Sequence, residues 1–174
     1  MRKVREMYQV GDKILYANTG ACVIERIESL RFDRKREKYY VLRPLFQKTS
    51  VIYVPVENQE LTSKMQPMPS RDEAEHLIDS LPAMEVFSIP DAQERKAYID
   101  ELMHQKGNGG LLKVIKSLYG IKRQRIREGK SLHVADENAL HEALRLLCDE
   151  LAYPLGTEPS QIFDRLQTTL EENA

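Results

Sequence analysis

The sequence contains no tryptophan and only two cysteines, Cys22 and Cys148, which lie far apart in the chain. So few thiols are typical of a protein in a reducing compartment. The alternative is a single disulfide between the two cysteines. No apolar run approaches the length of about 18 residues that a membrane helix needs. The first seven residues lack the apolar stretch of a signal peptide. We therefore expect a cytoplasmic protein.

Motifs for catalysis and metal binding are also missing. The sequence has neither an H-E-x-x-H pair nor a C-x-x-C pair, so we expect no zinc site. Residues 107–110 are rich in glycine, but they lack the Gly-Lys-Ser/Thr of a phosphate-binding loop and are better interpreted as a flexible loop between helices. Neither cysteine has the sequence context of a nucleophile beside a base. We expect a protein that is not an enzyme and takes no cofactor or small-molecule substrate.

The charges are segregated along the chain although the net charge is only -1. Residues 113–130 contain seven Lys/Arg and one Asp/Glu, whereas residues 131–174 contain two and nine. The basic segment is either a patch that contacts nucleic-acid phosphates or a solvated helix face that balances the acidic tail. Its candidate DNA-binding residues are Lys116, Lys122, Arg123, Arg125 and Arg127.

Residues 1–64 predict a small β-domain. Four segments are rich in β-branched and aromatic residues, and turn residues or a highly charged tip at 33–37 separate them. So many short strands in so few residues favour a strongly bent sheet or barrel, which is only marginally stable alone at this size. The expected strands cover residues 8–16, 22–27, 39–42 and 51–54.

Residues 70–174 predict a compact all-α domain of about five helices, and the two prolines at 65–69 mark the boundary before it. Ser70 and Glu73 form a capping box that opens the first helix. Apolar residues recur at three- and four-residue spacing in the later segments. The expected helices cover residues 70–81, 91–104 and 111–119, then 133 or 136 to 154, and finally 157 or 160 to 170.

Five short motifs, in order and at near-constant spacing, resemble the opening domain of the CarD-like family of bacterial RNA-polymerase-binding regulators, a domain also found in transcription–repair coupling factors. The helical half is similar to the family at residues 114–118 and 140–152, so the resemblance covers about residues 7–153. It implies an α+β fold in which a small Tudor/SH3-like β-barrel precedes a compact all-α domain. The five motifs lie at residues 10–12, 20–21, 24–28, 39–42 and 54–58.

The resemblance implies a transcription regulator that binds the β subunit of RNA polymerase by adding a strand to a sheet edge. It also implies that the helical domain contacts promoter DNA and modulates open-complex formation, which places the protein at the nucleoid. Two arginines of some family members fall on Leu30 and Tyr53. Together with Phe32 and Ile52 these residues form either a more apolar polymerase-binding surface or part of the barrel core.

The chain departs from the family where a tryptophan normally wedges against the minor groove, because Asp91 or Ala92 takes that place. A carboxylate repels phosphates and does not insert between bases. Nearby, Arg95 and Lys96 remain as candidate DNA-binding residues, whereas a DNA-facing lysine of the family falls on Glu137. The alternative function is therefore a polymerase-binding adaptor that lacks the DNA-wedging activity.

Overall fold

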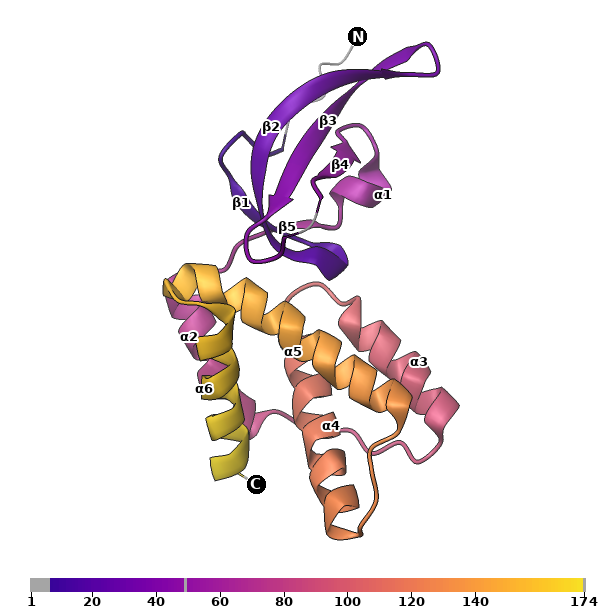
Figure 1. The fold of residues 1–174 in the computed structure, drawn as a ribbon, viewed down its shortest axis with the longest axis vertical. Helices are drawn as coiled ribbons and strands as arrows, with labels where there is room; N and C mark the ends of the chain where they lie inside the picture. Colours follow the sequence, from indigo (N-terminus) through magenta and orange to yellow (C-terminus); the bar gives the residue numbers. More distant parts are fainter. Residues whose placement is uncertain (1–6, 49, 174) are drawn as a thin grey trace. The chain divides into compact units, whose positions relative to one another are not determined.

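The computed structural model describes residues 7–48 and 50–173, and the chain divides into two units, Met1–Met68 and Pro69–Ala174 (Figure 1). The first unit is built on a β-sheet and the second is helical, so the predicted α+β class is confirmed. The start of the chain, where we predicted that no signal peptide is present, lies outside the described residues. No helix in the described ranges is both long enough and apolar enough to span a bilayer.

The β unit contains a five-stranded antiparallel sheet with the strand order β4-β3-β2-β1-β5. The sheet is open, with β4 and β5 at its two edges, so the Tudor/SH3-like description fits a bent sheet and not a closed barrel. A one-turn helix, α1 (Gln59–Thr62), follows β4. The strands are β1 (Lys13–Tyr16), β2 (Gly20–Phe32), β3 (Lys35–Pro44), β4 (Ile52–Pro55) and β5 (Met65–Pro67).

A long hairpin of β2 and β3 dominates the unit. Its turn is only Asp33-Arg34, both with positive φ (46° and 67°), which matches a two-residue type I′ connection. The predicted charged tip at 33–37 was too long, because residues 35–37 already pair with β2. The register shifts between Ile24 and Arg26, where a β-bulge bends the strand. That bulge decides which β2 residues face the core.

The segment 65–69, which we predicted as the boundary between the domains, also contains a strand, because β5 pairs with β1 there and the first unit extends to Met68. The strand escaped notice because it has three residues and ends in Pro67. A proline is tolerated at a sheet edge, where its missing N–H breaks no ladder bond.

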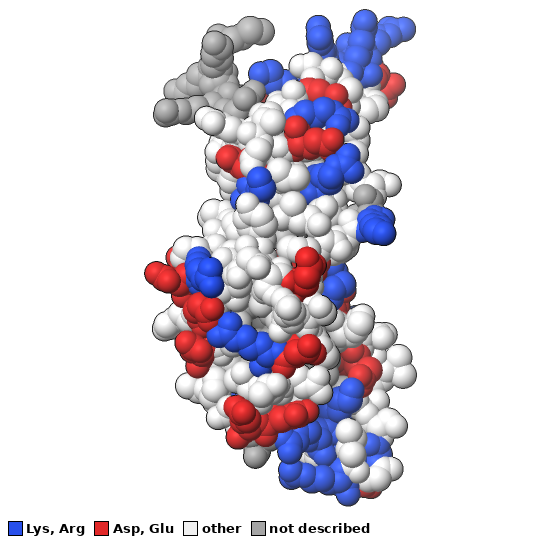
Figure 2. Space-filling model, turned by 60° about the vertical axis from the view of Figure 1, so that its left-hand side comes forward, with Lys and Arg blue, Asp and Glu red and all other residues white. Residues whose placement is uncertain are grey.

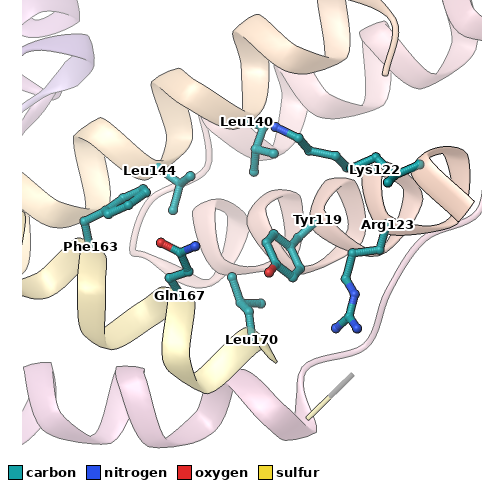
Figure 3. A pocket seen from close by; sticks show the side chains of 9 residues that line it. Tyr119, Lys122, Arg123, Leu140, Leu144, Phe163, Gln167 and Leu170 are labelled. Carbon is teal, nitrogen blue, oxygen red and sulfur yellow. The ribbon is translucent and has the colours of Figure 1, made fainter. Parts of the chain in front are cut away.

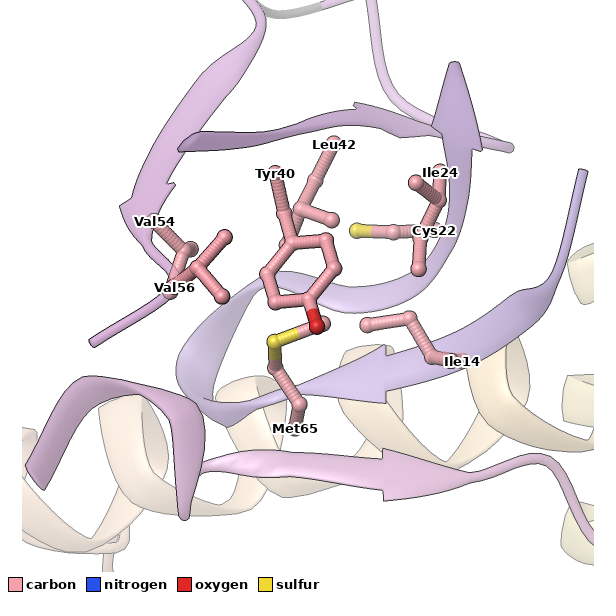
Figure 4. Close-up of a cluster of buried hydrophobic side chains, with 8 residues drawn as sticks. All are labelled: Ile14, Cys22, Ile24, Tyr40, Leu42, Val54, Val56 and Met65. Atoms are coloured by element: carbon pink, nitrogen blue, oxygen red, sulfur yellow. The ribbon is translucent and has the colours of Figure 1, made fainter. Parts of the chain in front are cut away.

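The core of the β unit is built around Tyr40, which lies in the middle of the cluster shown in Figure 4 and is only 2% exposed. Its hydroxyl accepts a hydrogen bond from the N–H of Met7 at 3.0 Å, so the phenol oxygen is satisfied although the ring is buried. Apolar residues from β1 to β5 surround the ring. The cluster comprises Ile14, Cys22, Ile24, Tyr40, Leu42, Val54, Val56 and Met65.

The helical unit is organised around α5, which packs against α2, α3, α4 and α6 (Figure 1). Its central position explains why its buried residues run almost continuously from Leu146 to Ala152. Five helices of eight residues or more form the described part of this unit, as the apolar spacing predicted. They are α2 (Arg71–Ser80), α3 (Ala92–Met103), α4 (Gly109–Arg127), α5 (Val134–Leu155) and α6 (Pro159–Glu172).

Local signals set the helix ends. The predicted capping box of Ser70 and Glu73 is present in both directions. The last helix begins differently from the prediction, because Glu158 is its N-cap and Pro159 occupies the first position, which favours proline. Gly110 at the start of α4 permits a close approach to α3, since an added Cβ would lie 2.1 Å from the carbonyl oxygen of Leu102.

Candidate functional site

One side of the β2–β3–β4 sheet faces away from the Tyr40 core, and we call it the outer face. The strand register places three of the predicted polymerase-binding residues, Leu30, Phe32 and Tyr53, on this side. Phe32 and Tyr53 are well exposed, at 61% and 42%, although both are large and apolar in character. The outer face comprises Arg26, Glu28, Leu30, Phe32, Tyr39, Val41 and Tyr53.

Three aromatic rings form a row across the outer face. Tyr39 lies at its centre, with edge-to-face contacts to Phe32 at a centroid distance of 5.8 Å and to Tyr53 at 6.4 Å. This arrangement suits the ring quadrupoles and holds the side chains in a defined orientation. An exposed row of oriented aromatics is typical of a surface that binds a protein partner.

Arg26 organises the charges beside this row. Its Nε donates to Glu28 at 3.2 Å and its Nη2 donates to the Tyr53 hydroxyl at 3.3 Å. The hydrogen bond to Glu28 raises the pKa of Arg26 above its ordinary value, and the nearby negative charges contribute to the same shift. Val41 pairs with Arg26 on one side and with Tyr53 on the other, and it is fully buried. The guanidinium therefore helps to fix the position of the exposed tyrosine.

Ile52 is separated from the other predicted polymerase-binding residues. It pairs with Leu42, whose side chain belongs to the core, and it packs against the core cluster itself. Because side chains alternate along a strand, Ile52 and Tyr53 point to opposite sides of β4. Ile52 therefore belongs to the core, which was one of the two roles predicted for it, and not to the binding surface.

The backbone of β4 offers one open edge of the sheet. The N–H of Val56 donates to Lys38 on β3 at 2.9 Å. Because backbone groups alternate in direction along an antiparallel strand, Val54 also bonds toward β3, and the N–H and C=O of Tyr53 point to the open side. Pro55 has no N–H, which is compatible with an edge strand. Tyr53 thus presents both a side chain on the outer face and backbone groups at the edge.

The sequence reasoning missed Tyr39 and Arg26 as members of this surface. Period-two alternation alone would have linked Tyr39 with Val41, but the side on which Arg26 lies depends on the bulge beside Glu25. The signal that could have found them is the register of the hairpin, counted outward from the two-residue turn at 33–34.

Arg95 is not available to DNA, which corrects its prediction as a DNA-binding residue. It is 5% exposed and forms a buried ion pair with Asp136, with Nη2–Oδ2 at 2.7 Å and Nε–Oδ1 at 3.0 Å. Its Nη1 donates to the carbonyls of Ile89 and Pro90. The sequence shows the charge of Arg95 but not that its partner lies 41 residues away.

Three other predicted DNA-binding residues are engaged within the helical unit. Lys116 donates to the carbonyls of residues 82 and 84, both at 2.6 Å, and ties that segment to α4. Lys122 pairs with Glu137 on α5 at 2.6 Å. Arg125 donates to the carbonyl of Ser131 and closes the loop after α4. Part of the basic segment therefore stabilises the helical unit.

The remaining predicted residues are Lys96, Arg123 and Arg127. Lys96 is exposed and makes a long pair with Asp100 at 3.8 Å, whereas Arg127 is exposed at the end of α4. Figure 2 shows Lys and Arg side chains gathered at one end of the helical unit, over the C-terminal end of α4. Cations are also favoured there by the negative end of the helix dipole.

Asp91, one of the two residues that we predicted at the place of the family tryptophan, has a local structural role. Its carboxylate accepts the N–H groups of Gln93 and Glu94, both at 2.9 Å, and caps α3. The exposed carboxylate of Glu94 lies in the same first turn of α3, and the exposed Lys96 follows it. The start of α3 therefore carries exposed charges of both signs, and its exposed apolar side chain, Ala92, is too small to act as a wedge.

Within the described ranges, no group of three or more His, Cys, Asp or Glu is placed to hold a metal ion. Cys22 and Cys148 are buried thiols, one in each unit, and they are not joined by a disulfide.

Comparison with known proteins agrees with the motifs. The sequence model of the CarD-like/TRCF RID domain matches residues 8–68. The chain is also 27% identical over 157 residues to the protein named "Putative transcription factor YdeB" of Bacillus subtilis (strain 168). That alignment covers 90% of this chain and 97% of the relative, so it includes both units. The resemblance predicted from the five motifs is confirmed.

Proposed function

We propose, given that this chain belongs to the CarD-like family through the RID domain of residues 8–68, that it docks on the β subunit of RNA polymerase through the outer face and the β4 edge. The family makes it a transcription factor with an RNA-polymerase-interacting domain. The β subunit as the docking point, and the residues that make the contact, are what we propose. A protein of this kind acts at the nucleoid through polymerase and has no need of catalytic residues.

The observation that carries the proposal is the position of Tyr53. Its backbone groups point to the open edge of the sheet, and its ring ends the aromatic row on the outer face. In strand addition, main-chain hydrogen bonds provide affinity and alternate side chains provide specificity. One residue here supplies both kinds of contact, which supports docking at this edge.

Two substitutions of Tyr53 separate the contribution of its ring from that of its backbone N–H. Tyr53→Ala removes the ring, whereas Tyr53→Pro also removes the N–H that points to the edge and breaks no bond to β3. We expect Tyr53→Ala to weaken binding to purified core polymerase by about tenfold, as for an exposed aromatic anchor. Tyr53→Pro should weaken it further. Biolayer interferometry with immobilised polymerase measures both.

The matched control is Val134→Ala in the helical unit, because Val134 is an apolar residue that is even more exposed, at 77%. It should leave polymerase affinity within about twofold of wild type. Circular dichroism should show that all three variants are folded. Unchanged affinity in Tyr53→Ala and Tyr53→Pro would refute docking through this edge, and binding to polymerase reconstituted without its β lobes would refute the choice of subunit.

For the helical unit we propose the adaptor function, without a DNA wedge. Asp91 caps α3 and Arg95 is buried, so the family's wedging position, Asp91 or Ala92, offers a carboxylate or a methyl group and no large apolar side chain. We expect the protein to bind polymerase without lengthening the lifetime of the open complex. Filter-binding decay with and without the protein tests this, and a lifetime extended several-fold would contradict it.

A second candidate function, direct contact with promoter DNA, is favoured by the basic end of α4. If it holds, Arg127→Glu combined with Lys130→Glu should reduce promoter affinity and lower the salt slope by about 0.9 for each lost phosphate contact. Lys106→Glu, at an exposed lysine in the loop between α3 and α4 that is not among the predicted DNA-binding residues, serves as the control for a general charge effect. An unchanged slope in the double variant would leave only the adaptor function.

A further inference from the structure

A groove in the helical unit shares Lys122 and Arg123 with the basic segment of α4 and is otherwise lined by residues not described above. It runs between α4 and α6, which each pack on α5, and it has a volume of about 290 Å³ (Figure 3). Its lining is mostly apolar and contains two cations but no carboxylate. The lining residues, which we call the α4–α6 groove, are Tyr119, Lys122, Arg123, Ile126, Leu140, Leu144, Phe163, Gln167 and Leu170.

The residues that line the groove follow helical spacing on both walls. On α4 they span residues 119–126, and on α6 they span residues 163–170. Each wall is therefore about 10 Å long, or two helical turns. Leu140 and Leu144, one turn apart on α5, form the floor. A groove with two helical walls and a leucine floor has the dimensions to receive a further helix.

Both walls expose apolar side chains at the groove. Ile126 on α4 is 60% exposed and Phe163 on α6 is 41% exposed. Both residues lie on amphipathic helices whose other apolar residues are buried, such as Leu118 and Leu166. Two large apolar side chains that face one groove from opposite walls form a patch that association with a partner would cover.

The polar atoms on the α4 wall indicate the charge of the partner. The Nη1 of Arg123 is buried and, among the described residues, has no hydrogen-bond partner. A guanidinium nitrogen without an acceptor is costly, so a carboxylate in the groove would be bound once the Arg123 side chain turns this nitrogen toward it. Lys122 has only the exposed pair with Glu137, which is weak enough to be shared with another carboxylate.

We propose that the α4–α6 groove binds an amphipathic helix of a partner protein, with leucine-type anchors on the floor and carboxylates against Lys122 and Arg123. The helix-in-groove mode uses anchors at spacings of three and four residues, as the walls and floor provide. DNA fits this site poorly, because Ile126 and Phe163 offer no hydrogen bond to a phosphate. The site is separate from the β unit, so its failure and the failure of polymerase docking are distinguishable.

The probes are two synthetic helical peptides of about 14 residues with the same leucine spacing, one flanked by glutamates and the other by lysines. Fluorescence anisotropy with the full chain measures their affinities. We expect the acidic peptide to bind at least about tenfold more tightly than the basic one, since the charged residues that line the groove are Lys122 and Arg123. In NMR spectra of the labelled full chain, the shifted amides should be those of residues 119–126 and 163–170.

Variants with matched controls test the site itself. Ile126→Ser and Phe163→Ser should each weaken the acidic peptide by about tenfold, and Arg123→Gln should lower its preference over the basic peptide. Val134→Ser and Lys96→Gln carry the same changes at exposed sites outside the groove and should stay within about twofold. Because Ile126 and Phe163 are largely exposed, thermal unfolding should show all variants folded.

Three outcomes would overturn the proposal. The first is no binding of the acidic peptide at millimolar concentration, or equal binding of both peptides. The second is self-association of the wild-type chain in sedimentation that Phe163→Ser abolishes, which would make a second copy the occupant. The third is duplex DNA that displaces the acidic peptide and loses affinity with Ile126→Ser, which would make the groove a nucleic-acid site.

Discussion

Arg95 of α3 and Asp136 of α5 form a buried ion pair in which Nη2 and Oδ2 lie 2.7 Å apart and both side chains are at most 6% exposed. The remaining Nη1 of Arg95 donates to the carbonyls of Ile89 and Pro90. One guanidinium thus joins α3, α5 and the segment that leads into α3. Because the guanidinium nitrogens of Arg95, which was predicted to contact DNA, are all satisfied inside the protein, Arg95 has a structural role.

Removal of one partner of this pair should destabilise the helical unit strongly. Arg95→Ala leaves the Asp136 carboxylate buried and unpaired, so we expect a loss of about 3–5 kcal/mol in the free energy of unfolding. Urea denaturation followed by circular dichroism measures it. Lys96→Ala, at the neighbouring exposed lysine, should change stability by no more than about 0.5 kcal/mol.

The double variant Arg95→Met with Asp136→Leu distinguishes charge burial from lost packing. It removes both charges and keeps apolar volume, so it should recover much of the stability that Arg95→Ala loses. A double variant as unstable as the single one would show that the two side chains do not act as a pair.

Lys116 should hold the segment between α2 and α3 in place. Its ammonium donates to the carbonyls of Pro82 and Met84, and the Ser117 hydroxyl next to it accepts the N–H of Phe87. Lys116→Met should therefore speed hydrogen exchange of residues 84–89 by about tenfold or more, since hydrogen bonds to charged groups contribute about 1.5–3 kcal/mol. Lys113→Met, which removes only a cation–π contact with Tyr98, should change exchange in that segment far less.

Glu150 should make stability depend on pH. Burial, followed by the nearby Asp149, raises the pKa of Glu150 to about 7, and its Oε2 has no partner among the described residues. A raised carboxyl pKa means that the folded state binds more protons than the unfolded state between pH 4.5 and about 7. Stability therefore falls as pH rises through this window. Glu150→Gln should stabilise the protein at pH 8, by up to about 3 kcal/mol, and have little effect at pH 4.

Glu142, on the same helix, provides a control of opposite sign. Its hydrogen bond from Arg145 holds the pKa of Glu142 below the ordinary value. It stabilises the fold above the unfolded pKa, and that contribution is lost as pH falls through the folded pKa. Glu142→Gln should thus lower stability at neutral pH. A Glu150→Gln variant whose stability showed no pH-dependent gain would contradict the raised pKa of that carboxyl.

Cys148 should be unreactive in the folded protein. Burial, followed by the charge of Asp149, raises the pKa of the Cys148 thiol to about 12, so almost no thiolate is present at neutral pH. Cys22 is also buried, at 0% exposed. Both thiols should react slowly with Ellman's reagent in buffer and rapidly in urea, and two thiols should be counted without reductant. Rapid modification of the folded chain at pH 7 would contradict this.

Most elements of the fold could be predicted from patterns among residues that are close in the sequence. The capping box at Ser70, the apolar spacing of the helices and the β-branched and aromatic residues from Tyr39 to Leu42 are local patterns, and each predicted its element. The exceptions were short or shifted elements, such as β5, where a proline at a sheet edge looks like a linker. The order and spacing of the five motifs also sufficed to predict the resemblance to the RID domain, because a motif is recognised without knowledge of contacts.

Pairing between distant segments decided the rest, because a side chain's direction and partner depend on register and packing. The bulge at Glu25 sets which β2 residues join Tyr53 on the outer face, and only the structure moves Ile52 to the core. Likewise, Arg95 looks like any other cation in the sequence until Asp136 is found beside it. The sequence by itself determined the class of protein and its helices and strands; the tertiary structure decided which residues are left to bind a partner.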